Sequence, residues 1–255
     1  MLDVSSGSGT LTADGVTVIA LNGIETLQYT GGTGTDNVIG TGGDDVLYGG
    51  YGEDTLRGGV GNDWMSGGED DDSLFGDDGE DGIYGEGGND RLYGGAGIDN
   101  MSGGDGDDWM AGGADQDHLN GDNGDDTIYG DAGVDYIYGD EGNDTLFGGA
   151  DNDSLDGGLG SNALYGGEGD DTLYSVTDSG TLDGGIGTDI AYIALDSSTE
   201  DHVLALSGGA GTLTTDGTAT MTLNRIEVLN YYGGSGGDSV TGSDGDDFVS
   251  GGGGD

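Results

Sequence analysis

Hydrophobic and polar positions repeat every nine residues along the chain between Gly31 and Tyr192. The eighth position is aliphatic or Met in 17 of the 18 consecutive units, and the last unit has Ala191 there. Position one is Gly in 17 units and position six is Asp in 16. Positions seven to nine place one apolar residue between two outward positions, as in a short half-buried strand. The pattern therefore predicts a three-residue strand and a six-residue turn in every unit.

Each unit of turn and strand is expected to form half a coil, so that two units of nine residues close one right-handed coil. Side chains alternate along a strand, so the position-eight residues all point inward and form a core one side chain thick. With strands ~4.8 Å apart, nine coils would make a rod of about 43 Å. We attribute the glycines at positions one, two and four to turn residues with positive φ. The predicted fold is all-β, a right-handed parallel β-roll (a β-helix or solenoid) of nonapeptide repeats.

Residues outside this block form a second, longer repeat. The segment 205–232 repeats the segment near the N-terminus at an offset of 202 residues. The N-terminal copy predicts a hairpin around Asp14-Gly15 followed by one more strand. Both ends of the chain fall inside this module, so we expect a piece of a longer tandem array. The predicted domains are a β coupler or cap at 1–30, the 18-repeat roll at 31–192, a second β coupler at 193–232 and a truncated second roll at 233–255.

The couplers are expected to be short β-sandwich-like segments. The end of a roll exposes unpaired strand edges, and a coupler that covers them prevents edge-to-edge association. A coupler would also join one roll to the next.

Charge narrows the range of partners. The chain has 52 acidic residues and three Arg, with no Lys and no Cys, and a net charge of −49. A nucleic-acid-binding protein needs a basic surface, so we expect no nucleic-acid partner. The sequence has no run of about 18 apolar residues, so no membrane insertion is expected.

The position-six aspartates are the candidate metal ligands. Stacked coils would place two carboxylates ~4.8 Å apart, and at an effective dielectric constant of about 20 they repel by about 3.5 kcal/mol. Many oxygen ligands without Cys favour a hard cation, and Ca²⁺ fits better than Zn²⁺ or Mg²⁺. Because the core is thin, metal binding must contribute to folding itself. The predicted ligands are Asp36, Asp45, Asp54, Asp63, Asp72, Asp81, Asp90, Asp99, Asp108, Asp117, Asp126, Asp135, Asp144, Asp153, Asp171, Asp189, Asp238 and Asp247.

Two units of the block lack this carboxylate. Asn162 still offers an oxygen, whereas Gly180 offers none, so one column of ligands should weaken near Gly180. Asp238 and Asp247 are expected to have incomplete sites, because their stacking partners would lie beyond Asp255.

The unit at 58–66, GGVGNDWMS, resembles the RTX, or haemolysin-type, calcium-binding nonapeptide repeat. The resemblance implies several Ca²⁺ ions, roughly one per repeat, bound by turn carbonyls and the position-six aspartates. It also implies export by a type I secretion system and a location outside the cell or at its surface. The interruption that follows Tyr192 resembles those between RTX arrays.

Three functions are compatible with such a repeat block. The favoured hypothesis is a calcium-dependent structural module of a secreted extracellular protein, such as an adhesin stalk, surface layer or filament, in which neighbouring copies could associate. The alternative is the RTX repeat region of a type I-secreted enzyme or toxin whose catalytic or pore domain lies outside this chain. An ice-binding roll would need outward rows of Thr and Asx at positions three and five. Position three instead runs Thr33, Gly42, Tyr51 and Val60, so the row is absent.

No catalytic residues are predicted. The segment 233–237 matches Gly-x-Ser-x-Gly, but it lies in a glycine-rich repeat and not at a strand-to-helix turn. His118 and His202 have no second ligand or base at a useful spacing, so both are expected at the surface. Position nine is aromatic in 10 of 18 units. Together with Trp64 and Trp109 at position seven, these residues predict cross-strand stacking on the outer faces, with lateral contact to another rod as the alternative.

Overall fold

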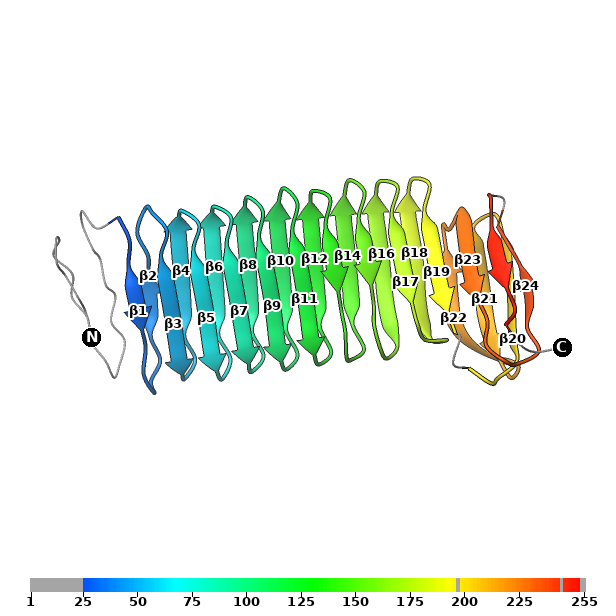
Figure 1. Cartoon of the computed structure of the whole chain (residues 1–255), viewed down its shortest axis with the longest axis horizontal. Helices are drawn as coiled ribbons and strands as arrows, with labels where there is room; N and C mark the ends of the chain where they lie inside the picture. Colours follow the sequence, from blue (N-terminus) through cyan, green and yellow to red (C-terminus); the bar gives the residue numbers. More distant parts are fainter. Residues whose placement is uncertain (1–24, 196–197, 244, 253–255) are drawn as a thin grey trace. The chain divides into compact units, whose positions relative to one another are not determined.

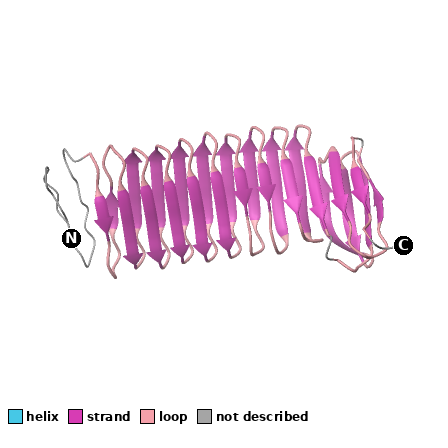
Figure 2. Cartoon of the chain, viewed as in Figure 1, coloured by secondary structure: helices cyan, strands magenta, loops and turns pink. Residues whose placement is uncertain are grey.

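The structure is a computed structural model that describes residues 25–195, 198–243 and 245–252. The described residues form 25 β-strands and no helix (Figure 2), and so include no helix long and apolar enough to cross a membrane. The chain divides into two compact units, residues 1–130 (unit 1) and 131–255 (unit 2). The hairpin predicted around Asp14-Gly15 lies outside the described residues.

Unit 1 is a stack of parallel strands in two sheets (Figure 1). Odd-numbered strands follow one another in one sheet and even-numbered strands in the other. Paired residues are 18 positions apart, as in Leu47 with Met65 and Leu56 with Leu74, which confirms two nonapeptides per coil. The strands are β1 (Gln28–Thr30), β2 (Asn37–Ile39), β3 (Val46–Tyr51), β4 (Thr55–Val60), β5 (Trp64–Glu69), β6 (Ser73–Asp78), β7 (Gly82–Gly87), β8 (Arg91–Ala96), β9 (Asn100–Asp105), β10 (Trp109–Ala114), β11 (His118–Asn123) and β12 (Thr127–Ala132), the last ending beyond Gly130.

The strands are longer than the sequence pattern predicts. Most strands of unit 1 span six residues, which are positions seven to nine of one nonapeptide and one to three of the next. In β3 and β5, Gly50 pairs with Gly68 within the ladder. The prediction of a six-residue turn was therefore wrong, because the two leading glycines belong to the strand. Only positions four to six turn, as Gly52 to Asp54 do.

Position eight forms the core, as predicted. Its residues from Val38 to Ala191 are at most 1% exposed. Position one follows two residues later on the strand, so it also faces inward, and its glycine leaves little volume to fill. The core of each coil is therefore one aliphatic side chain from each sheet.

Leu92 provides a test of this thin core. Leu92→Ala should lower the free energy of unfolding of the calcium-loaded protein by about 2–5 kcal/mol, because a cavity remains where no second layer can relax. The control is Ile98→Ala, since the Ile98 side chain is 48% exposed. Denaturant unfolding followed by circular dichroism would measure both changes. Equal effects of the two substitutions would contradict a core of this kind.

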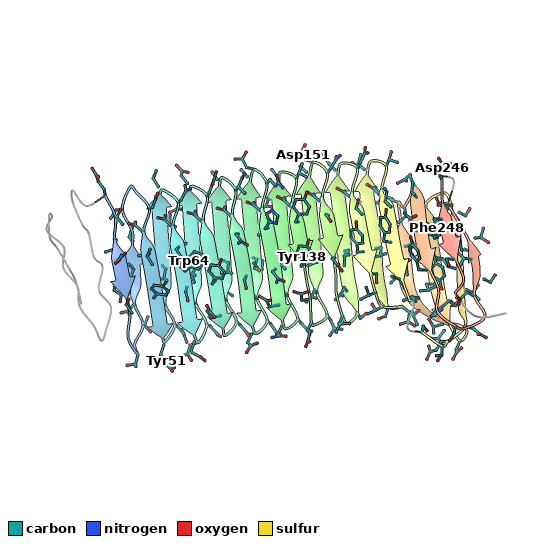
Figure 3. The ribbon with its side chains drawn as sticks, in the orientation of Figure 1. Tyr51, Trp64, Tyr138, Asp151, Asp246 and Phe248 are labelled. Carbon is teal, nitrogen blue, oxygen red and sulfur yellow. The ribbon has the colours of Figure 1, made fainter. Side chains whose placement is uncertain are left out.

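Outward aromatic side chains stack across neighbouring strands, which confirms that prediction. The Phe75 and Tyr93 ring centroids lie 4.7 Å apart with planes inclined by 7°, and those of Tyr93 and Trp109 lie 4.9 Å apart. The Arg57 guanidinium covers the free face of Phe75 at 4.9 Å. Figure 3 shows Trp64 among the outward side chains. Lateral contact with another rod stays a prediction.

Unit 2 also has two sheets, with the orders β13-β15-β17-β19-β23-β25 and β14-β16-β18-β22-β21-β20-β24. Its strands are β13 (Tyr136–Tyr138), β14 (Thr145–Ala150), β15 (Ser154–Asp156), β16 (Asn162–Glu168), β17 (Thr172–Ser175), β18 (Gly180–Ile186), β19 (Ile190–Ala194), β20 (His202–Ser207), β21 (Ala210–Thr215), β22 (Thr218–Asn224), β23 (Val228–Tyr232), β24 (Ser239–Thr241) and β25 (Phe248–Ser250).

The second coupler is built into these sheets. β20, β21 and β22 form an antiparallel meander, while β22 pairs in parallel with β18 and β23 pairs in parallel with β19. Parallel pairing resumes from β20 to β24 and from β23 to β25. The coupler thus covers the edges of the roll by hydrogen-bonding to them. The domain boundaries given above stay a prediction.

Strand β23 shifts the frame of the repeats by two residues. Leu229 pairs with Ala191, which is at position eight, but on the other side of β23 Tyr231 pairs with the position-eight residue Val249. An even shift keeps every side chain on its own face of the sheet. Leu229 and Tyr231 are accordingly both buried.

Candidate metal sites

The position-six aspartates end the turns, and the stacking of coils buries them. From Asp36 to Asp189 they are at most 5% exposed. Asp238 and Asp247, in the last coil, are half-buried as residues, although the Asp238 side chain is only 2% exposed. Carboxylates buried to this extent require hydrogen-bond donors or cations.

In most of these carboxylates one oxygen has a backbone donor. Oδ1 accepts a hydrogen bond from the backbone N–H of the position-six residue one coil earlier. The distance is 2.7 Å from Asp63 N to Asp81 Oδ1 and 2.9 Å from Asp81 N to Asp99 Oδ1. The same bond links Asp153 to Asp171 at 2.9 Å in unit 2. This bond fixes the side chain and aligns the carboxylates into two columns, one beside each sheet.

The other oxygen lacks a donor in ten of these aspartates, whereas Asp45 Oδ2 accepts the Thr41 N–H. Oδ2 is buried and accepts no hydrogen bond in Asp54, Asp63, Asp72, Asp81, Asp90, Asp99, Asp108, Asp153, Asp171 and Asp189. A buried polar atom without a partner destabilises a fold by about 1–3 kcal/mol, and more when it carries charge. Repetition along two columns indicates a shared missing counter-charge.

Position-one glycines make room for this oxygen. A Cβ at Gly94 would overlap both Asp99 Oδ2 and the carbonyl oxygen of Gly112, one coil later. Carboxylate and carbonyl oxygens therefore face the same small space. The position-one glycines do not have positive φ, so that part of the prediction was wrong. Positive φ occurs at positions two and four, as in Gly95 (123°) and Gly97 (117°).

Burial raises the pKa of these carboxyl groups. The pKa rises to about 7 for Asp72 and Asp99, and to about 8 for Asp108 and Asp153. Desolvation is the largest cause, the backbone hydrogen bond to Oδ1 lowers the pKa, and neighbouring aspartates raise it again. Near neutral pH, Asp108 and Asp153 therefore favour the protonated form unless a cation replaces the proton.

The donors suit a hard cation. Within the described ranges, no three side chains of His, Cys, Asp or Glu gather into a metal-binding group. Each site would accordingly combine a carboxylate with backbone carbonyl oxygens, and oxygen-only ligand sets are those of Ca²⁺. The residues present fit that ion.

The model of the RTX calcium-binding nonapeptide repeat matches the chain repeatedly, covering residues 30–173 and 231–255. The chain belongs to the RTX calcium-binding repeat family. Such repeats bind Ca²⁺, roughly one ion per repeat. No curated protein matches the chain. The unmatched stretch contains most of the coupler, where the RTX frame is interrupted.

Sequence reasoning missed a second ladder in the RTX turns. Side chains at position five accept hydrogen bonds from the backbone N–H one coil later, as Asp44 does from Asn62 at 2.9 Å. Asn89 does the same from Asp107 at 3.0 Å. This direction is opposite to that of the position-six ladder, so each turn is held from both sides. The signal was visible, since most position-five residues are Asp, Asn, Glu or Ser.

Two further residues take position six inside the coupler. Val228 pairs with Ile190, which places Glu227 opposite Asp189, and Glu227 Oε2 accepts the Asp189 N–H at 3.0 Å. Val203 pairs with Ser239, which places His202 opposite Asp238. Neither residue follows the glycine pattern, and the frame shift hides their phase. Only the register of the strands reveals their role.

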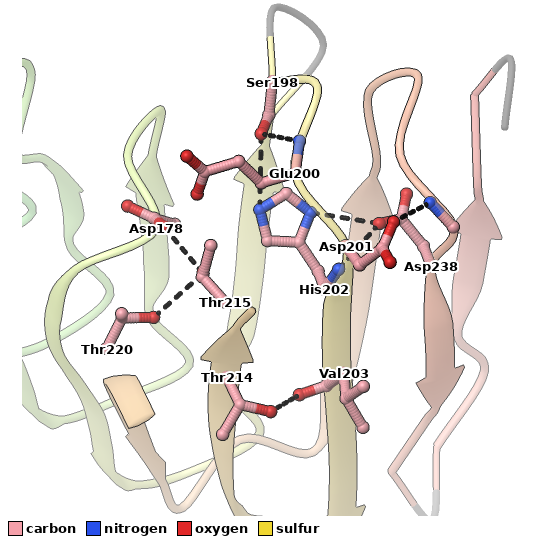
Figure 4. A network of polar contacts seen from close by, with 11 residues as sticks. Asp178, Ser198, Glu200, Asp201, His202, Val203, Thr214, Thr215, Thr220 and Asp238 are labelled. Atoms are coloured by element: carbon pink, nitrogen blue, oxygen red, sulfur yellow. Dashed lines mark hydrogen bonds and ion pairs between the residues drawn. The ribbon is translucent and has the colours of Figure 1, made fainter. Parts of the chain in front are cut away.

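The prediction for His202 was wrong, because this side chain is fully buried. Its backbone N–H and its Nδ1 lie 3.1 Å and 3.0 Å from Asp238 Oδ1 (Figure 4). Nε2 lies 3.5 Å from Ser198 Oγ. His118 is exposed, as predicted.

Ser198, His202 and Asp238 follow the order of a nucleophile, base and acid, but the surroundings do not support catalysis. The 3.5 Å from Oγ to Nε2 exceeds the reach expected of a nucleophile and its base. Ser198 Oγ also accepts the Glu200 N–H at 3.2 Å. The adjacent pocket of about 280 Å³ is lined by Asp178 and Glu200, whose charges oppose a developing oxyanion. We assign these residues to the structure of the coupler.

Proposed function

We propose that this chain is a calcium-dependent structural module of a secreted extracellular protein, such as an adhesin stalk, surface layer or filament. It folds as its carboxylate columns take up Ca²⁺ outside the cell. The observation that carries this proposal is the column of buried Oδ2 atoms without hydrogen-bond donors. A fold that buries so many carboxylates requires an external source of positive charge.

The proposed ligands are the position-six carboxylates from Asp36 to Asp189, together with Asp238 and Asp247. In each turn Oδ1 holds the preceding coil, Oδ2 faces the ion, and the position-one glycine leaves space for it. When bound, Ca²⁺ supplies the charge that offsets repulsion along the column.

Export in an unfolded state follows from the same chemistry. With a net charge of −49 and few apolar residues, the ion-free chain has the composition of a disordered protein. The low Ca²⁺ concentration of the cytosol keeps the chain unfolded, and the unfolded chain passes through a type I secretion system. Outside, an ion that binds only the folded form draws folding forward.

The repeated module favours a structural role over the repeat region of an enzyme or toxin. The second coupler repeats the first at an offset of 202 residues, and repeats resume after it. Tandem arrangement suits a stalk or filament, in which neighbouring copies associate. If the sequence of the parent protein contained a single array beside a catalytic domain, the repeat region of an enzyme or toxin would be the correct assignment.

A calcium titration tests the proposal. Chelator-treated protein should lack β-sheet signal in circular dichroism, and Ca²⁺ should produce it cooperatively, with contraction in small-angle scattering. Mg²⁺ at the same concentration is the control, and it should fail because it retains its waters. A chain that folds equally well without Ca²⁺ would overturn the proposal.

A further inference from the structure

Asn162 reveals what closes an RTX turn when no carboxylate is present. Its Oδ1 accepts the Asp144 N–H at 2.8 Å, so it continues the position-six ladder as an aspartate would. Its Nδ2 lies 2.6 Å from the carbonyl oxygen of Gly157 and 3.5 Å from that of Leu159. These carbonyls are at positions one and three of the same nonapeptide.

The amide nitrogen of Asn162 thus stands where other turns have Oδ2. In an aspartate turn, a carboxylate oxygen faces the carbonyl oxygens with no hydrogen between them, as at Asp153. Oxygens that face each other repel unless a cation or a proton lies between them. The N–H groups of Asn162 supply such hydrogens permanently.

His202 provides an independent second case in the coupler, although the strand register places Leu204, and not His202, on the row of Asn162 and Gly180. It takes position six opposite Asp238, and its Nδ1 reaches Asp238 Oδ1 at 3.0 Å. The imidazole brings nitrogen where a carboxylate would bring oxygen. Between Asn162 and His202 in the chain, Gly180 has no side chain to offer.

We propose that the turn closed by Asn162 takes up no Ca²⁺, because the side-chain N–H groups of Asn162 take the place of the ion. This inference rests on the proposed binding of Ca²⁺ by the position-six carboxylates. It lowers the number of ions at the end of the roll beside the coupler, where the other column still carries Asp171 and Asp189. That end also has a larger apolar core, which includes Leu204, Leu206, Leu213, Met221 and Leu223.

A reciprocal exchange of Asn and Asp tests the inference by counting ions. Bound Ca²⁺ per chain would be measured by equilibrium dialysis at saturating Ca²⁺, with folding checked by circular dichroism. Asn162→Asp should gain one ion per chain over the wild type. Asp153→Asn is the matched control, since Asp153 Oδ1 accepts the Asp135 N–H at 2.9 Å in the same way, and it should lose at least one ion while staying folded.

The outcomes separate this inference from the proposed function. No gain in Asn162→Asp, with a loss in Asp153→Asn, would overturn the inference and leave calcium binding intact. A wild type that binds no Ca²⁺ would overturn the proposed function. If Asn162→Asp does not fold, Asn162→Ala provides a second test of the inference. Its ion count should equal that of the wild type, while amide hydrogen exchange in 157–162 becomes faster, and a lower count would overturn the inference.

Discussion

In calcium-free buffer, lowering the pH from 8 to 5 should restore much of the β-sheet signal that chelation removes. Burial raises the pKa of the position-six carboxyl groups to about 6 in Asp54, about 7 in Asp99 and about 8 in Asp108. In the unfolded chain these groups have a pKa of about 4. The folded form therefore binds protons more tightly, and protons stabilise it. This contribution is complete below about pH 4 and is lost as the pH rises through 6 to 8.

Circular dichroism across this range, with a chelator present, would measure the effect. Stopping at pH 5 keeps the protein above its isoelectric point of about 4.1 and limits precipitation. With saturating Ca²⁺ the signal should be nearly constant, while the apparent affinity for Ca²⁺ falls as protons compete for the same oxygens. If the calcium-free chain stayed unfolded at pH 5, the charge of the carboxylate columns could not be the only factor that prevents folding.

The sequence predicted the coil and its core because both depend on a period. Residues equivalent to Leu92 recur every nine positions, and because side chains alternate along a strand, these residues all face inward. Asp99 is at a fixed distance from Leu92, so its column follows from the same spacing. Both inferences follow from the spacing of residues in the sequence and require no knowledge of contacts between coils.

What the sequence did not reveal depends on contacts between coils. Gly94 and Gly95 are the same letter, yet Gly94 is required only for the space beside Asp99 Oδ2 and the Gly112 carbonyl oxygen, whereas Gly95 combines a positive φ with a close approach to the Asp77 carbonyl oxygen. His202 takes position six only because β20 pairs with β24 across 36 residues, a register that no local pattern encodes. Asn162 was predicted to offer an oxygen still, and only the carbonyl oxygens around Nδ2 show it to be a hydrogen-bond donor.

Gly94→Ala should remove calcium binding at its turn and destabilise the loaded roll by about 1–3 kcal/mol, the range for overfilled interiors. The new Cβ would overlap Asp99 Oδ2 and the Gly112 carbonyl oxygen, both on the wall of the proposed ion site. Backbone strain contributes little, because Gly94 does not have positive φ. At least one Ca²⁺ per chain should be lost in equilibrium dialysis, and the midpoint of denaturant unfolding should fall.

Gly87→Ala is the matched control, since Gly87 is also a glycine of unit 1 without positive φ. A Cβ there would meet its nearest atoms, the Gly68 carbonyl oxygen and Glu69 Oε2, at 3.9 Å and 4.0 Å, an ordinary contact distance. Its stability should stay within about 0.5 kcal/mol of the wild type, with the ion count unchanged. If the two alanines behaved alike, the position-one glycine would serve the flexibility of the chain and not the space that the ion needs. A loss of ions confined to Gly94→Ala would instead show that the glycine at position one is needed for the aspartate at position six to bind its ion.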